Sequence, residues 1–229
     1  MAIYSGRVRE VRMGHDGSLE GLVACPPRAV PAPGRYVQAH APMEIDAPLG
    51  TPLFLSQSTS DGFWAAPPLP AGWAPGTELV LRGPLGRGFD LPVAVSRLAL
   101  AAFGESPAHL LPLALVALRR DCSVTLFTDV ALPNLPASLE IYPLASLRES
   151  LSWPDLLALE LPLARLPELR GQLGLDSIQP LPCQAQALIW TPMPCAGIGE
   201  CGACAVPARH GYKLACVDGP VFPLNTLDW

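Results

Sequence analysis

The chain has 229 residues, of which 50% are hydrophobic and only 15% are charged, and its net charge is −5. The length allows one large domain or two small ones. The negative charge and the absence of Lys/Arg runs exclude a nucleic-acid-binding protein, which needs clustered positive charge. The low charged fraction indicates that part of the surface is apolar, as at an interface with a partner protein.

No membrane span is predicted. The longest apolar stretch, residues 98–118, is interrupted by Glu105, His109 and prolines, whereas a spanning helix needs roughly 18 or more apolar residues in a row. The opening MAIYSGRVREVRM carries charges where a signal peptide has its apolar core. The odd count of seven cysteines then favours a reducing compartment over a disulfide framework. We therefore expect a cytoplasmic protein.

Residues 1–95 predict an antiparallel β-barrel or sandwich. Short segments rich in β-formers are separated by Gly and Pro, a pattern typical of strands joined by tight turns. We expect strands at residues 4–13, 19–25, 35–39, 52–55, 62–66 and 78–82.

From about residue 96 the pattern changes to strands that alternate with helices. The apolar run 97–103 predicts a strand buried on both faces. Ser106 followed by Pro107 has the form of a helix N-cap with proline in the first turn, and we expect this helix to reach Arg120. Such alternation indicates a parallel α/β sheet over residues 96–190. Further strands are expected at 124–128, 139–142, 156–159 and 186–190, with helical pieces near 144–152 and 163–173.

The segment 191–229 forms a third predicted part, a cysteine module. Cys195, Cys201, Cys204 and Cys216 are separated by five, two and eleven residues. This spacing is close to the C-x4-C-x2-C…C run with which plant-type ferredoxins hold a [2Fe–2S] cluster. We therefore interpret the four cysteines as cluster ligands.

Glycines between these cysteines support the interpretation. Gly197, Gly199 and Gly202 permit positive φ, which lets the backbone curl around a bulky ligand. A curl of this kind also points N–H groups at the negatively charged sulfurs, so the three glycines are the predicted cofactor-binding residues. Residues 205–216 predict a hairpin that returns Cys216 to the loop.

Four cysteines also suit a structural zinc ion, so a zinc-stabilised interaction module remains an alternative. Zinc ribbons usually present two short Cys pairs, whereas this segment offers one, Cys201 with Cys204. A second alternative is a binding or assembly subunit that keeps the cluster but has lost flavin and nicotinamide. The sequence contains no G-x-S-x-G nucleophile elbow, no Walker loop and no paired-carboxylate motif, so we nominate no catalytic residue.

Three segments resemble the electron-transfer subunit of heteromeric dihydroorotate dehydrogenases, a branch of the ferredoxin–NADP reductase superfamily. They are GTELVLRGPLGRGF at 76–89, LLPLA at 110–114, and CAGIGECGAC at 195–204 with ACVDGPVF at 215–222. The resemblance implies a barrel that holds FAD, an α/β domain that receives NAD and four cysteines that hold [2Fe–2S]. It also implies hetero-oligomeric docking on an FMN-bearing catalytic subunit, in pyrimidine biosynthesis.

The chain departs from the family at three places. Five residues, not four, separate Cys195 from Cys201. Residues 50–55, where the family has an arginine for the flavin diphosphate, read GTPLFL, so whether FAD is retained is left open, with Arg35, Arg82 and Arg87 as alternative cations. The glycine-rich turn of the nicotinamide site is reduced to residues 103–107, FGESP, in which the Glu105 carboxylate would oppose a pyrophosphate, so NAD is not expected.

Overall fold

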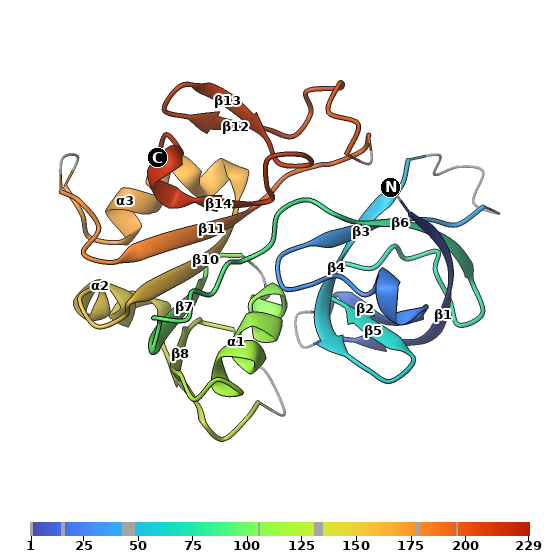
Figure 1. The fold of residues 1–229 in the computed structure, drawn as a ribbon, viewed down its shortest axis with the longest axis horizontal. Helices are drawn as coiled ribbons and strands as arrows, with labels where there is room; N and C mark the ends of the chain where they lie inside the picture. The colour runs from blue at the N-terminus through green and yellow to red at the C-terminus, as the bar shows by residue number, and fades with distance from the viewer. Residues whose placement is uncertain are drawn as a thin grey trace.

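The computed structural model describes residues 2–14, 17–42, 49–104, 106–130, 135–176, 179–195 and 197–229. In Figure 1 the barrel lies on the right, the α/β sheet on the left, and the hairpin of the cysteine segment above the sheet. No helix among the described residues is long and apolar enough to cross a bilayer.

The predicted barrel is confirmed: six antiparallel strands close in the order β1-β2-β5-β4-β3-β6. Val23, Val37, Leu53 and Phe63 alternate inward and are at most 1% exposed, which gives the barrel a dry core. The strands are β1 (Ile3–Met13), β2 (Leu19–Ala24), β3 (Tyr36–His40), β4 (Thr51–Ser58), β5 (Gly62–Ala65) and β6 (Glu78–Leu85), with the short helix η1 (Pro27–Ala29) after β2.

The predicted α/β sheet is also confirmed. It has six strands in the order β14-β11-β10-β7-β8-β9, all parallel except β14, which runs antiparallel to β11. The chain winds outward from β7 to β9 and then returns to place β10 on the other side of β7, so the strand order reverses there. The strands are β7 (Arg97–Ala102), β8 (Ser123–Phe127), β9 (Leu139–Tyr142), β10 (Leu156–Pro162), β11 (Gln184–Trp190) and β14 (Val221–Pro223).

The helices are shorter than expected. Ser106 caps the predicted first helix, but this helix is split into two pieces and ends at Leu118, not Arg120. The reason is a left-handed turn, in which Asp121 has φ of 57° and the Cys122 N–H donates back to the Ala117 carbonyl. The helices are η2 (Pro107–His109), α1 (Leu111–Leu118), η3 (Leu144–Ser146), α2 (Leu147–Ser150), η4 (Leu163–Glu168), α3 (Leu169–Gln172) and η5 (Leu224–Thr226).

The cysteine segment is tied into the rest of the fold. Its hairpin consists of β12 (Ala205–Ala208) and β13 (Gly211–Leu214), as predicted. Its last strand, β14, was not predicted and extends the α/β sheet by pairing with β11. The Arg87 N–H, just after β6, donates to the Gly219 carbonyl, and Arg87 bridges to Pro220. Both halves of the molecule therefore contact the tail.

Candidate metal centre

The structure brings the four predicted cysteines together in one chain of contacts. The sulfurs of Cys195 and Cys216 lie 4.0 Å apart, and the Cys201 thiol is close enough to Cys195 to help lower the pKa of Cys195. The backbone N–H of Cys216 donates to the Cys204 sulfur over 3.4 Å. Residues 21 positions apart in the chain thus meet at one place.

The hairpin is what closes the group. The Ala215 N–H donates to the Cys204 carbonyl at the open end of β12 and β13, which fixes Cys204 beside Cys216. Cys204 and Cys216 are buried, Cys195 is half-buried and Cys201 is exposed. The group therefore runs from the interior to the surface, with Cys201 at its outer end.

All three predicted glycines adopt a left-handed backbone: φ is 77° at Gly197, 82° at Gly199 and 70° at Gly202. A Cβ at Gly202 would meet no atom within 4 Å, so this position requires glycine for its backbone conformation alone. A Cβ at Gly199 would lie 3.1 Å from Val217, so crowding adds to the conformational requirement. The loop can curl around the sulfurs because of these residues.

The thiols do not ionise alike. Burial raises the pKa of Cys195, but N–H groups of Gly199 and Ile198 and the neighbouring thiols outweigh it and lower that pKa to about 6. Burial, followed by the adjacent sulfurs of Cys204 and Cys195, raises the pKa of Cys216 to about 12. Ionising Cys216 next to the sulfurs of Cys204 and Cys195 is therefore unfavourable, and a cationic centre bound among the thiolates would remove this repulsion.

A barrel residue completes the surroundings. The Tyr36 hydroxyl, on β3, donates to the Cys216 carbonyl over 3.1 Å. Burial, then the sulfurs of Cys216, Cys204 and Cys195, raises the pKa of Tyr36, so the phenol stays protonated and can donate. Sequence reasoning missed Tyr36, because no local pattern connects it to a residue 180 positions away.

The segment that the resemblance assigns to the flavin diphosphate offers no cation to it. Residues 50–55 contain no charged side chain. The Phe54 ring lies 5.3 Å from the His109 ring and 5.4 Å from the Trp190 ring, centre to centre, and His109 and Trp190 are 4.4 Å apart. Phe54 and His109 are each 3% exposed. The chain's own rings fill the junction between barrel and sheet.

Two of the three arginines considered as alternatives, Arg35 and Arg87, are used elsewhere or lie elsewhere, whereas Arg82 is near enough to Tyr36 to act on its pKa. Arg35 is not a solvated charge: its guanidinium donates to the carbonyls of Gly86 and Pro84 over 3.1 and 3.0 Å and braces the turn after β6. Arg87 is exposed and faces the pocket described below.

The nicotinamide turn is closed by a residue that sequence reasoning missed. A Cβ on Gly104 would lie 2.6 Å from a carboxyl oxygen of Glu160, which is only 3% exposed at the end of β10. Burial raises the pKa of Glu160 to about 8. Ser106 accepts a hydrogen bond from the Ala108 N–H and serves as an ordinary cap. Glu105 lies outside the described residues, and the described residues of this turn do not fit a pyrophosphate.

Three further cysteines and the hairpin histidine take no part in the contacts of the centre. Cys122 is buried and its thiol donates to the Val95 carbonyl, whereas Cys25 and Cys183 are half-buried. His210 is exposed at the hairpin turn. Among the described residues, no three His, Cys, Asp or Glu side chains lie close enough together to hold one metal ion as the structure stands. The four cysteines are in pairwise contact, and their sulfurs would have to draw closer to bind a cluster.

Comparisons with known proteins agree with the tail and the fold. Residues 191–228 match the model of the iron–sulfur cluster binding domain of dihydroorotate dehydrogenase B. No curated protein sequence matches the chain.

Several solved structures share the fold. The structure of an NADH-dependent reduced ferredoxin–NADP oxidoreductase is 18% identical with a TM-score of 0.77, over 98% of this chain and 90% of that one. A ferredoxin reductase in carbazole 1,9a-dioxygenase, in its FAD apo form, is 20% identical with a TM-score of 0.59, over 82% and 68%. An Amycolatopsis cytochrome P450 reductase is 15% identical with a TM-score of 0.59, over 82% and 70%. The fold is ferredoxin reductase-like, and the tail match supports an iron–sulfur cluster and an electron-transfer role.

Proposed function

We propose that this chain is the electron-transfer subunit of a dihydroorotate dehydrogenase-like enzyme and holds a [2Fe–2S] cluster on Cys195, Cys201, Cys204 and Cys216. The observation that carries the proposal is the pairwise contact of Cys195, Cys216 and Cys204 beside a loop that contains Cys201 and three left-handed glycines. The match of residues 191–228 to an iron–sulfur binding domain supports it.

The arrangement suits two irons. A [2Fe–2S] cluster is held by four thiolates and supplies reversible one-electron transfer when bound. The chain's residues hold and tune that charge. The N–H groups of Gly199 and Ile198 point at the Cys195 sulfur and stabilise its anion, while burial of Cys204 and Cys216 keeps water from the inner side.

The outer side is suited to a partner. Cys201 is exposed. Ile198, in the same loop, is 57% exposed, and Val217, which lies beside Gly199 of that loop, is 47% exposed. Apolar side chains beside an exposed ligand favour docking of another protein over the centre. We propose a flavin-bearing dehydrogenase subunit as that partner, so that electrons pass between its flavin and the cluster.

The test is anaerobic purification followed by iron, sulfide, zinc and flavin analysis and EPR of the reduced protein. We expect two irons per chain, as a [2Fe–2S] cluster requires, with an EPR signal on reduction and no FAD. Stoichiometric zinc in a colourless protein would establish the zinc-stabilised module instead. Retained FAD with NADH oxidation would show that the aromatic junction opens to cofactors.

The partner is tested separately. Co-expression with a dihydroorotate-oxidising flavoprotein subunit from the same genome should give a stable complex in which dihydroorotate reduces the cluster. A full cluster without complex formation would retain the electron-transfer role and overturn the proposed partner. A complex that forms but transfers no electrons would favour the assembly-subunit alternative, which the filled junction also supports.

A further inference from the structure

A pocket with a volume of about 830 Å³ lies at the end of the α/β sheet opposite to Gly104 and Glu160. Leu156 and Gln184, the first residues of β10 and β11, line it, so it opens at the amino ends of these parallel strands. Open α/β sheets usually bind nucleotides at the carboxyl ends of their strands. The pocket is therefore a different place from the closed nicotinamide turn.

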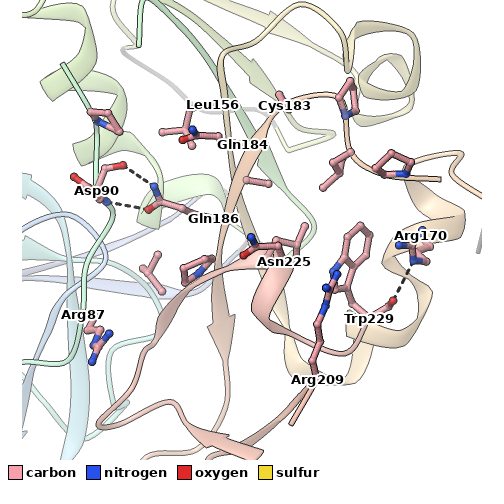
Figure 2. Close-up of a pocket in the computed structure, with 18 of the residues that line it drawn as sticks. Arg87, Asp90, Leu156, Arg170, Cys183, Gln184, Gln186, Arg209, Asn225 and Trp229 are labelled. Atoms are coloured by element: carbon pink, nitrogen blue, oxygen red, sulfur yellow. Dashed lines mark hydrogen bonds between the residues drawn. The ribbon is translucent and has the colours of Figure 1, made fainter. Parts of the chain in front are cut away.

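Three arginines from three separate segments reach this pocket. Arg87 comes from the connection after β6, Arg170 from α3, and Arg209 from the turn between β12 and β13. Figure 2 shows Arg87 on one side of the view and Arg170, Arg209 and Trp229 on the other. Residues far apart in the sequence thus gather positive charge around one cavity.

The charges of two of these arginines are uncompensated. Arg87 and Arg209 are exposed, and within the described part of the chain neither side chain has a hydrogen bond or ion pair. Arg170 donates to the carbonyls of Asp176 and Gln179 and lies 4.5 Å from the centre of the Trp229 ring. Arg170 also donates from Nε to the Trp229 oxygen over 3.3 Å (Figure 2). Its guanidinium is held in place rather than left mobile.

The opposing negative charge on the wall is small. Asp90 contributes one carboxylate, and its backbone is fixed by two hydrogen bonds with the Gln186 amide, of 2.9 and 2.6 Å. Among the described residues, the wall thus carries two free guanidinium groups, Arg87 and Arg209, against one acidic side chain, although the whole chain has a net charge of −5. A concave site with one sign of charge concentrates ions of the other sign.

We propose that this pocket binds an organic polyanion the size of a mononucleotide. Guanidinium groups match phosphate oxygens in a two-pronged geometry, and uncompensated ones have no partner to give up. The volume lies within the range of roughly 300 to 1,000 Å³ that is typical of small-molecule sites. Trp229, whose ring Arg170 already covers on one face at 4.5 Å, adds apolar surface to the wall.

Isothermal titration of the purified, cluster-containing protein with ATP, inorganic triphosphate and adenosine tests the site. We expect saturable binding of ATP, weaker binding of triphosphate and no binding of adenosine alone. Arg87→Ala with Arg209→Ala should weaken ATP binding about tenfold for each arginine removed. The affinity of the Arg87→Lys, Arg209→Lys variant for ATP should lie between those of the wild type and the double alanine variant. Lysine keeps the positive charge but lacks the two-pronged hydrogen-bonding geometry of a guanidinium group.

The matched control is Arg28→Ala with Arg119→Ala, which removes two exposed arginines that lie outside the pocket. Absence of saturable ATP binding up to about 1 mM, or an equal loss in the control, would overturn the proposal. So would binding of a polyglutamate peptide, but not of ATP, that depends on Arg87 and Arg209, because this would assign the pocket to an acidic segment of a protein. None of these outcomes depends on the cluster's redox role.

Discussion

The cysteine tail and the junction between barrel and sheet are both places that the family resemblance assigns to cofactors, yet they are built in opposite ways. In the tail, left-handed glycines leave room, the thiols of Cys195 and Cys216 face each other, and backbone N–H groups reach the sulfurs of Cys195 and Cys204. At the junction, the rings of Phe54, His109 and Trp190 contact one another and leave little exposed surface. A cofactor site needs space and unsatisfied ligands, and only the tail offers both.

The two regions should therefore depend on different forces. The tail has a three-residue strand, a short hairpin and an exposed loop, so it gains much of its order from whatever binds its sulfurs. The junction is stabilised by apolar packing, which no added ligand replaces. Variants that act on one region and spare the other would establish this contrast.

The largest effect is expected from removing a ligand. Cys201→Ser changes an exposed side chain, so loss of the cluster could not be blamed on a disrupted core. We expect iron and visible absorbance to fall nearly to zero, and residues 191–229 to become more sensitive to proteolysis than the barrel. Cys183→Ser, a half-buried cysteine outside the group, is the matched control. A Cys201→Ser protein with its full iron content would remove Cys201 from the ligand set.

Packing at the junction gives the next largest effect. Phe54→Ala should lower the free energy of unfolding by about 3–5 kcal/mol, the usual cost of deleting a buried phenyl ring, while leaving the iron content unchanged. Urea unfolding followed by tryptophan fluorescence measures it. Ile141→Ala, at a position 49% exposed, should change it by about 0.5 kcal/mol or less. A loss below about 1 kcal/mol at Phe54 would mean that the junction is loosely packed after all.

Much of this architecture was predictable because its signals are local. Alternating segments with Gly and Pro turns predicted the six barrel strands, and the apolar run before Ser106 predicted β7. The cysteine spacing indicated that Cys195, Cys204 and Cys216 would lie near one another, and that the four cysteines ligate a cluster stays a prediction. Each of these signals lies within a stretch of about 30 residues or fewer, the scale on which periodicity and motif spacing operate.

The residues that close the cofactor sites were not predictable for the same reason. Glu160 reaches Gly104 and Tyr36 reaches Cys216 only because distant strands pack side by side. The segment GTPLFL showed only that the arginine for the flavin diphosphate is missing. It did not show that His109 from η2 and Trp190 from β11 would pack against Phe54 at the junction. Strand β14 has three residues, too few for a periodic signal.

A smaller effect is expected from the buried carboxyl at the nicotinamide turn. Burial raises the pKa of Glu160 from 4.5 to about 8, so between these values the folded state binds more protons than the unfolded state. The contribution of Glu160 to the free energy of unfolding should therefore be largest below pH 4.5. It should fall by on the order of a few kcal/mol as the pH rises toward 8. Glu160→Gln should remove this decline, as measured by urea unfolding between pH 5 and 9.

The control for this pH dependence is Glu149→Gln, at an exposed position on α2. It should leave the wild-type decline in place. If Glu160→Gln follows the same pH curve as the wild type, Glu160 is ionised in the folded protein, and the turn is more open to water than its 3% exposure indicates.

The smallest effect concerns the bond that links the two regions. Tyr36→Phe removes the donor to the Cys216 carbonyl and should cost about 1 kcal/mol. Because this bond holds the tail against the barrel, the loss should favour opening of the tail and speed iron release to a chelator by about fivefold. Tyr212→Phe, at a position 75% exposed, should change neither rate nor stability. If Tyr36→Phe releases iron at the wild-type rate, the tail is anchored through β14 and the Arg87–Gly219 contact alone, and the barrel does not support the metal centre.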